Sequence, residues 1–188
     1  MKTTLNKIAS IQTGLFAKTV SKGEIVYLQV KHFNEEGQLQ SILHPDLKAD
    51  QINKKHLLKH GDVLFSAKGT KNFAAWYESK NQAAVASTSF FVIRMQENFS
   101  NKILPEFLVW LINHRVAQKF LKGKAIGTSI VSISKSVLED LEIFLPDVKT
   151  QKTILKIGQL HNSEKCLKKK IEILKEIQIQ QQLMNAIK

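Results

Sequence analysis

Residues 127–154 read GTSIVSISKSVLEDLEIFLPDVKTQKTI, and the character of the chain changes within this stretch. Ser134 to Leu141 predicts a short helix that is capped by the Ser134 side chain. Glu142 to Leu145 predicts a final strand, which ends at Pro146. The sequence therefore predicts two parts, a folded domain over residues 1–146 and a separate segment over residues 147–188.

The part before residue 147 is expected to consist mainly of short β-strands joined by polar loops. Its β-branched and aromatic residues gather in four segments, Glu24–Val30, Asp62–Ala67, Phe73–Tyr77 and Thr88–Met95. One helix interrupts this pattern: Pro105 suits its first position, and apolar residues that share one face continue to Leu121, before Gly123. The predicted fold class is α+β, a β-rich domain with a few helices.

The part from Asp147 to Lys188 predicts one long helix, because it contains no proline and a single glycine. About 38 helical residues at ~1.5 Å each would extend roughly 55 Å, more than the domain needs to cover its core. We therefore expect its apolar side chains to meet another helix, in a coiled-coil-like assembly. The side chains predicted for that contact are Leu160, Leu167, Ile171, Leu174, Ile177 and Met184.

The spacing of these apolar residues begins as a coiled-coil seam and then shifts. The first stripe becomes polar at Gln178 and Gln181, and a second stripe continues on a neighbouring face. This pattern favours a short antiparallel pairing or a mixed helical bundle over a long parallel zipper.

The charge of the chain points to a polyanionic partner. Twenty-eight basic residues against sixteen acidic ones leave a net charge of +12, and such a field attracts nucleic acid over a Debye length of ~8 Å. A basic face that docks on an acidic protein is the alternative. No apolar run reaches the ~18 residues of a membrane span, and the lone Cys166 agrees with a reducing compartment, so we predict a cytoplasmic protein.

Signatures of catalysis are missing from the sequence. It contains no Walker loop, no Gly-x-Gly-x-x-Gly motif and no nucleophile elbow. His56 and His60 are spaced as two ligands on one helix face, but no suitable third ligand follows. We predict no catalytic residue, no metal site and no cofactor.

Three basic loops that contain glycine are the candidate binding elements, at residues 14–22, 68–72 and 122–129. Each alone is equally compatible with an ordinary solvated loop, but three of them on one β-rich scaffold favour binding. The predicted phosphate contacts are Lys18, Lys22, Lys68, Lys71, Lys122 and Lys124. The predicted base-edge or positioning contacts are Thr70, Asn72, Thr128 and Ser129. Aromatic residues near these loops, Phe16 among them, could pack against bases or sugars. For at least half of them, burial in the core is the expected role.

The order of these features resembles that of a target-recognition domain in the specificity subunits of type I restriction-modification systems. The stretch at residues 127–154 resembles the end of such a domain, with its small-residue turn, short helix, Leu-Pro strand end and long helix. Leu5–Gly14 (LNKIASIQTG) resembles the opening, and Gly61–Thr70 (GDVLFSAKGT) resembles the central strand and loop. Asp147 and Lys149-Thr150 depart from the family's pattern at the start of the helix.

The resemblance implies a non-catalytic DNA-binding subunit that carries one recognition domain where the family usually has two. It implies pairing of two such half-subunits through residues 147–188 as a homodimer, and therefore a bipartite, palindromic target in double-stranded DNA. It also implies two partners, a modification subunit with methyltransferase chemistry and a restriction subunit that is a motor-nuclease. Met1 favours a natural half-sized subunit. A protein-interaction adaptor, with a basic β domain and an oligomerising helix, remains the alternative.

Overall fold

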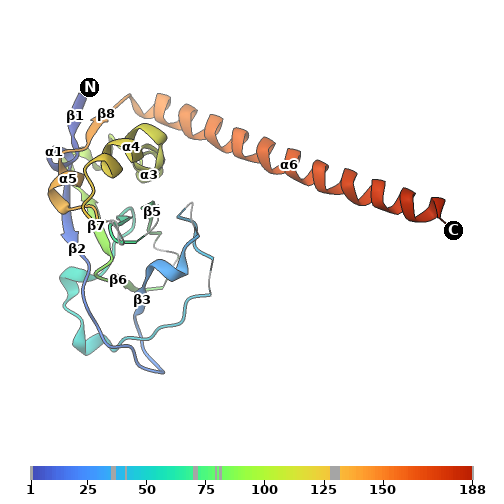
Figure 1. Cartoon of the computed structure of the whole chain (residues 1–188). Helices are drawn as coiled ribbons and strands as arrows, with labels where there is room; N and C mark the ends of the chain where they lie inside the picture. The colour runs from blue at the N-terminus through green and yellow to red at the C-terminus, as the bar shows by residue number, and fades with distance from the viewer. Residues whose placement is uncertain are drawn as a thin grey trace. The chain divides into compact units, whose positions relative to one another are not determined.

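The computed structural model describes residues 2–34, 37–40, 42–69, 72–78, 80, 82–127 and 132–187. The chain divides into two compact units, Met1–Val148 and Lys149–Lys188. The first unit is an α+β domain of small sheets and short helices, and the second belongs to a single long helix (Figure 1). The α+β class predicted from the sequence is confirmed, as is the long helix. The roles predicted for the two parts stay predictions.

A four-stranded antiparallel sheet forms the centre of the domain. Its strands, in spatial order, are β2 (Ala9–Thr13), β7 (Phe90–Met95), β4 (Val63–Ser66) and β5 (Ala74–Trp76). Two smaller pairings accompany it. The first is antiparallel, β1 (Lys2–Thr4) with β8 (Glu142–Phe144), and the second is parallel, β3 (Val26–Leu28) with β6 (Ala84–Ala86).

The helices of the domain are short. They are α1 (Leu5–Ile8), α2 (Glu97–Ser100), α3 (Pro105–Asn113), α4 (Arg115–Gly123) and α5 (Lys135–Glu139), with 3-10 turns η1 (Val30–His32), η2 (Ala49–Gln51) and η3 (Lys54–His56). The helix predicted before residue 147 is confirmed as α5, and the Ser134 hydroxyl accepts a hydrogen bond from the Val137 backbone N–H (3.3 Å).

Both faces of the central sheet are covered, which explains the unbroken apolar run of β4. Val63 and Phe65 belong to a cluster with residues of α1, α3, α4 and α5. Leu64, between them, belongs to a second cluster with residues of β3 and β6. Successive side chains of a strand point to opposite faces. The sheet is thus the middle of three layers, with helices on one face and the β3–β6 pair on the other.

An ion pair between partly exposed Arg94 and buried Asp62 joins β7 to the segment that leads into β4. The Arg94 guanidinium donates to both carboxylate oxygens of Asp62, at 2.8 and 2.6 Å, and also to the Leu57 carbonyl at 3.0 Å. These hydrogen bonds to Asp62 raise the pKa of Arg94. The Lys59 backbone N–H donates to the same carboxylate (2.8 Å). The basic segment before β4 is therefore fixed against the sheet.

Two expectations about element boundaries are corrected. The helix expected from Pro105 to Leu121 breaks at His114, whose ψ of 144° is extended. The His114 side chain accepts the N–H of Val116 (3.4 Å) and so caps α4. The strand expected over Glu24–Val30 is limited to β3, since the chain turns into η1 at Val30.

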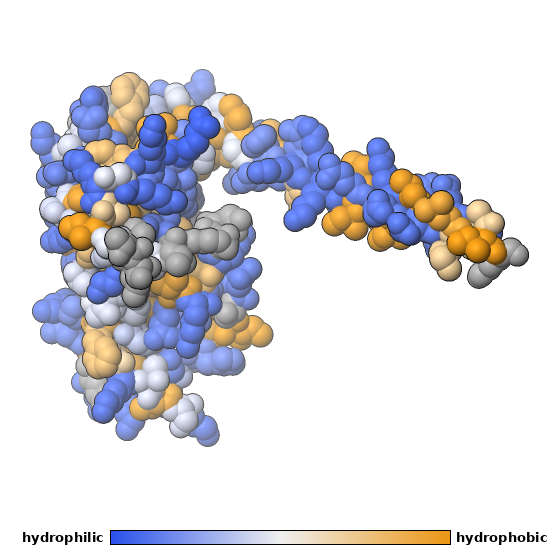
Figure 2. Space-filling view, in the orientation of Figure 1, coloured by the Kyte–Doolittle hydropathy of each residue, from blue (hydrophilic) through white to orange (hydrophobic). Residues whose placement is uncertain are grey.

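The second unit is the body of helix α6 (Val148–Ala186), a single run of 39 residues. At ~1.5 Å per residue it is about 58 Å long. Figure 2 shows apolar side chains exposed along it among polar ones. Among the residues that the structure describes, no helix combines the length and the apolar character that crossing a bilayer requires.

Candidate nucleic-acid interface

Two of the three basic loops leave the same end of the central sheet. β2 ends at Thr13 and β4 ends at Ser66, and their partners in the sheet are Phe91 and Phe90, the first two residues of β7. Both neighbouring strands run antiparallel to β7, so their last residues lie beside its beginning. The loop after β2 and the loop after β4 therefore start side by side.

The third loop is bonded to the second. Lys68 and Ser132 form an antiparallel β-bridge, and the Ile133 N–H donates to the Ala67 carbonyl (2.9 Å). Ile126 and Ser132 exchange two backbone hydrogen bonds, at 3.0 and 2.9 Å, which close the third loop at its base. The second and third loops, joined by the Lys68–Ser132 bridge, thus meet at the edge where the first loop also begins, and we call this edge the loop end of the domain.

The first loop is pinned at its start by Gly14. The Gly14 N–H donates to the Phe90 carbonyl (3.0 Å), and the Leu15 N–H donates to the Ala86 carbonyl (2.9 Å). A Cβ atom on Gly14 would lie 2.0 Å from the Ser87 carbonyl oxygen, so any other residue would collide with this backbone. Glycine is needed here for close approach, and the approach holds the first loop against the turn before β7.

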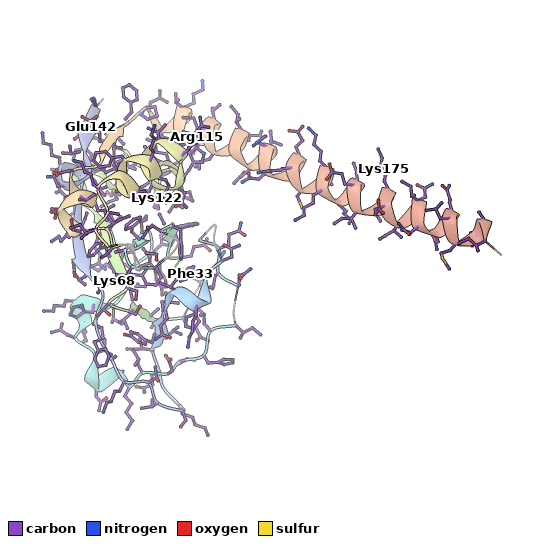
Figure 3. All side chains as sticks on the ribbon, viewed as in Figure 1. Phe33, Lys68, Arg115, Lys122, Glu142 and Lys175 are labelled. Atoms are coloured by element: carbon purple, nitrogen blue, oxygen red, sulfur yellow. The ribbon has the colours of Figure 1, made fainter. Side chains whose placement is uncertain are left out.

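The predicted phosphate contacts that the structure describes are exposed, as such contacts must be. Lys18 and Lys22 lie on the first loop, Lys68 follows β4, and Lys122 lies in the last turn of α4 rather than on the following loop (Figure 3). The Lys124 ammonium lies 4.6 Å from the centroid of the Phe120 ring. Lys71, Thr70, Thr128 and Ser129 lie outside the described residues, so their predicted contacts stay predictions.

Asn72, predicted as a base-edge or positioning contact, is buried in this structure, and its predicted contact stays a prediction. Only 7% of Asn72 is exposed, and its amide nitrogen donates to the Ser66 carbonyl (2.9 Å). The Ser66 N–H in turn donates to the Phe73 carbonyl (2.8 Å). Asn72 therefore closes the turn between β4 and β5 from inside. Residue type suggested an exposed amide, and only the tertiary structure shows that it is buried.

Sequence reasoning missed a polar hollow beside the first loop. The hollow is lined by Gln12, Thr13, Gly14, Lys55, His56, Ala86, Val92 and Arg94. Lys55 and His56 belong to η3, about forty residues after Gly14, and the hydrogen bond from Arg94 to the Leu57 carbonyl holds this segment in place. The spacing of His56 and His60 bears only on metal binding, for which the sequence predicts no site. The described residues contain no group of three His, Cys, Asp or Glu side chains that could hold a metal ion.

The carboxylates next to the first loop accept backbone hydrogen bonds. Asp46 accepts from the Tyr27 N–H (2.8 Å), and Glu24 accepts from the Ala49 N–H (3.1 Å). These hydrogen bonds direct the carboxylates toward the domain's own backbone. Within the part of the chain that the structure describes, Lys18 and Lys22 form no ion pair with a carboxylate, and they give the surface a positive character suited to phosphate groups.

Two other surfaces are apolar. The six side chains predicted for helix assembly each keep about half or more of their surface exposed in this single chain, between 51% for Ile171 and 61% for Leu160.

In the domain, a groove of about 280 Å³ is lined by Trp110, Leu111, His114, Val116, Ala117, Phe120, Leu141, Glu142 and Phe144. No local sequence pattern predicts this groove, because its walls come from α3, α4 and β8.

The comparison with protein families identifies the class of this chain. The model of the type I restriction modification DNA specificity domain matches residues 4–180. The chain therefore belongs to this family, and the resemblance seen in the sequence is confirmed.

One relative is the type I restriction enzyme MjaX specificity subunit of Methanocaldococcus jannaschii. It is 31% identical over 136 residues, which cover 69% of this chain and 31% of the relative. The present chain thus spans about a third of that protein.

Solved structures agree on the fold. The S subunit of a type I system from M. genitalium matches with a TM-score of 0.58 at 15% identity, over 87% of this chain and 39% of that one. The HsdS subunit of Thermoanaerobacter tengcongensis gives a TM-score of 0.61 at 17% identity, over 90% and 39%. A chain from a study of type I complex assembly gives 0.65 at 16% identity, over 90% and 40%.

Proposed function

We propose that this chain is a DNA-recognition component of a type I restriction-modification system and that it binds duplex DNA through the loop end of its domain. The observation that carries this proposal is the gathering of three basic loops at one end of the central sheet. Membership of the DNA specificity family supports it. The chain itself performs no catalysis in this proposal, and modification and restriction subunits supply methyl transfer and cleavage.

In this proposal the lysines of the loop end bind phosphates and set the register of the domain on DNA. Small polar side chains of the second and third loops, Thr70, Thr128 and Ser129, read base edges. The two kinds of contact have different signatures. Loss of a phosphate contact weakens binding to every sequence and lowers its salt dependence, whereas loss of a base contact relaxes preference at one position.

The finer part of the proposal is that two copies pair through α6. Ten large apolar side chains of this helix are exposed in the single chain, and an unpaired helix with so much apolar surface favours association. An antiparallel two-fold pair would place the two domains at opposite ends of the helices. Such a dimer would read two half-sites separated by a spacer, in inverted orientation.

The test is the salt dependence of DNA binding by lysine variants. We expect Lys68→Ala to weaken binding to all duplexes and to reduce the slope of log K against log salt by about one unit. Lys102→Ala is the matched control, since Lys102 is exposed beyond the C-terminal end of β7, at the opposite end of the sheet. Equal slopes for the two variants and the wild type would contradict the proposed interface. Retention of an acidic protein in place of DNA would favour the adaptor.

A further inference from the structure

An exposed phenylalanine stands on the first loop between two side chains that point inward. Phe16 is 79% exposed. Its neighbours Leu15 and Ala17 pack against the buried cluster formed by Ile25, Tyr27, Leu47 and Val85. Because neighbouring side chains of an extended segment alternate in direction, anchoring both neighbours directs Phe16 outward. Its exposure is therefore built into the packing.

The backbone around Phe16 is held at several points. Beside the bonds of Gly14 and Leu15 to the turn before β7, the Tyr27 hydroxyl donates to the Leu15 carbonyl (2.9 Å). Further along, the Val20 N–H donates to the Asp46 carbonyl (2.7 Å). A ring presented on such a fixed segment can enter a partner with little loss of conformational entropy.

The surroundings of Phe16 fit an anionic, aromatic partner. Lys18 and Lys22 follow on the same loop, and Lys55 and His56 line the hollow at Gly14. An exposed aromatic ring that is followed on its own loop by lysines is a combination that suits a wedge entering the base stack while the lysines bind nearby phosphates.

We propose that Phe16 inserts against a base step of the bound duplex and partly unstacks it, so that the first loop contributes to sequence preference through deformability of that step. This inference rests on the proposed DNA binding and names one residue of the same interface. No covalent chemistry is involved. In this proposal, Lys18 and Lys22 bind DNA phosphates next to the step that Phe16 enters.

The experiment uses the full chain and a duplex enriched from a randomised pool by the wild type. Dissociation constants are measured for the wild type, Phe16→Ala, Phe16→Leu and the control Phe144→Ala. Phe144 is comparably exposed, at 68%, but lies on β8 outside the three loops. The same duplex carries 2-aminopurine at successive positions, and an increase in its fluorescence reports unstacking.

We expect Phe16→Ala to raise the dissociation constant about 10- to 100-fold without a change in salt slope, and Phe16→Leu to retain part of the affinity. Phe144→Ala should stay within about twofold of the wild type. Wild-type binding should raise 2-aminopurine fluorescence at one position in each half-site, and Phe16→Ala should abolish that rise. Melting temperatures should match, because Phe16 contributes little buried surface.

Two outcomes would overturn the inference, and they differ from a failure of DNA binding itself. If the wild type binds the selected duplex while Phe16→Ala binds equally well, Phe16 does not enter the DNA. If affinity falls but no position shows unstacking in the wild type, the wedge is refuted. A wild type that retains no duplex would instead overturn the proposed function, and this inference with it.

Discussion

The domain and the helix treat their apolar residues in opposite ways. In the domain, strands and helices far apart in the sequence bury residues such as Phe65 and Ile112 completely. In α6, Leu167, Ile171 and Leu174 each leave half or more of their surface exposed. The domain therefore has a core of its own, whereas the apolar surface of the helix is available to a partner. The stability of the domain is therefore expected to be independent of protein concentration. Burial of the apolar surface of α6 requires a partner and would depend on protein concentration.

The largest expected effect is on the core of the domain. Phe65→Ala should lower the free energy of unfolding by about 3–5 kcal/mol, because Phe65 is fully buried in the sheet. Urea unfolding followed by tryptophan fluorescence measures this loss. The loss should be the same at low and high protein concentration. A strong concentration dependence would show that the domain needs a partner to fold stably.

The next effect is on the ion pair that fixes the segment before β4. Asp62→Ala leaves the Arg94 guanidinium without its carboxylate, and the side chains are 22% and 2% exposed. Since water reaches Arg94 in part, we expect a loss of about 2–4 kcal/mol in the same unfolding experiment.

An exposed ion pair is the control for Asp62→Ala. Lys2 and Glu142 lie 2.9 Å apart with both side chains more than 60% exposed, so Glu142→Gln should cost less than about 1 kcal/mol. Similar losses of unfolding free energy in Asp62→Ala and Glu142→Gln would mean that the burial of an ion pair does not determine its contribution to stability.

A third effect should appear in association and not in folding. Leu167→Ala should leave the unfolding of the domain unchanged and raise the dissociation constant of the proposed homodimer about 10- to 100-fold. Sedimentation equilibrium measures it, with Lys169→Ala as a control on another side of the helix. A monomeric wild type at high concentration would contradict the pairing of α6.

The smallest effect concerns pH. Burial and the neighbouring Lys31 lower the pKa of His32 from 6.5, and Asp46 opposes them; the His32 Nδ1 also accepts the Gln29 N–H (3.2 Å). The unfolded chain therefore binds a proton before the folded chain does. The contribution of His32 is present above pH 6.5 and declines as the pH falls through 6.5 toward the lower folded pKa.

The stability advantage of the wild type over His32→Gln should accordingly shrink between pH 8 and pH 5. Thermal melting of both proteins at the two values measures this difference. An advantage that grows toward low pH would show that His32 is protonated in the folded domain.

Local sequence signals predicted the elements whose causes are local. The apolar run around Phe65 predicted β4, Ser134 predicted the cap of α5, and the proline-free tract after Asp147 predicted α6. For α5 and α6, neighbouring residues supply most of the determining interactions, whereas the local apolar run indicates β4 and distant elements complete its burial.

Features that depend on distant partners were not predictable in the same way. The pairing of Lys2 in β1 with Phe144 in β8 joins the two ends of the domain. No hydrophobic periodicity in the sequence predicts this pairing. The break at His114 and the burial of Asn72 also depend on packing. The loops were recognised one by one as basic and rich in glycine, but their meeting at one end follows from strand register, which one sequence does not specify.

The most direct measurement is the selection of duplexes from a randomised pool by the full wild-type chain, with Leu167→Asp beside it. We predict that the wild type enriches two inverted half-sites separated by a fixed spacer. The variant, with its helix pairing broken, should enrich a single half-site with weaker affinity. Enrichment of the same undivided site by both proteins would contradict pairing through α6, and enrichment of no sequence would contradict DNA recognition by the domain.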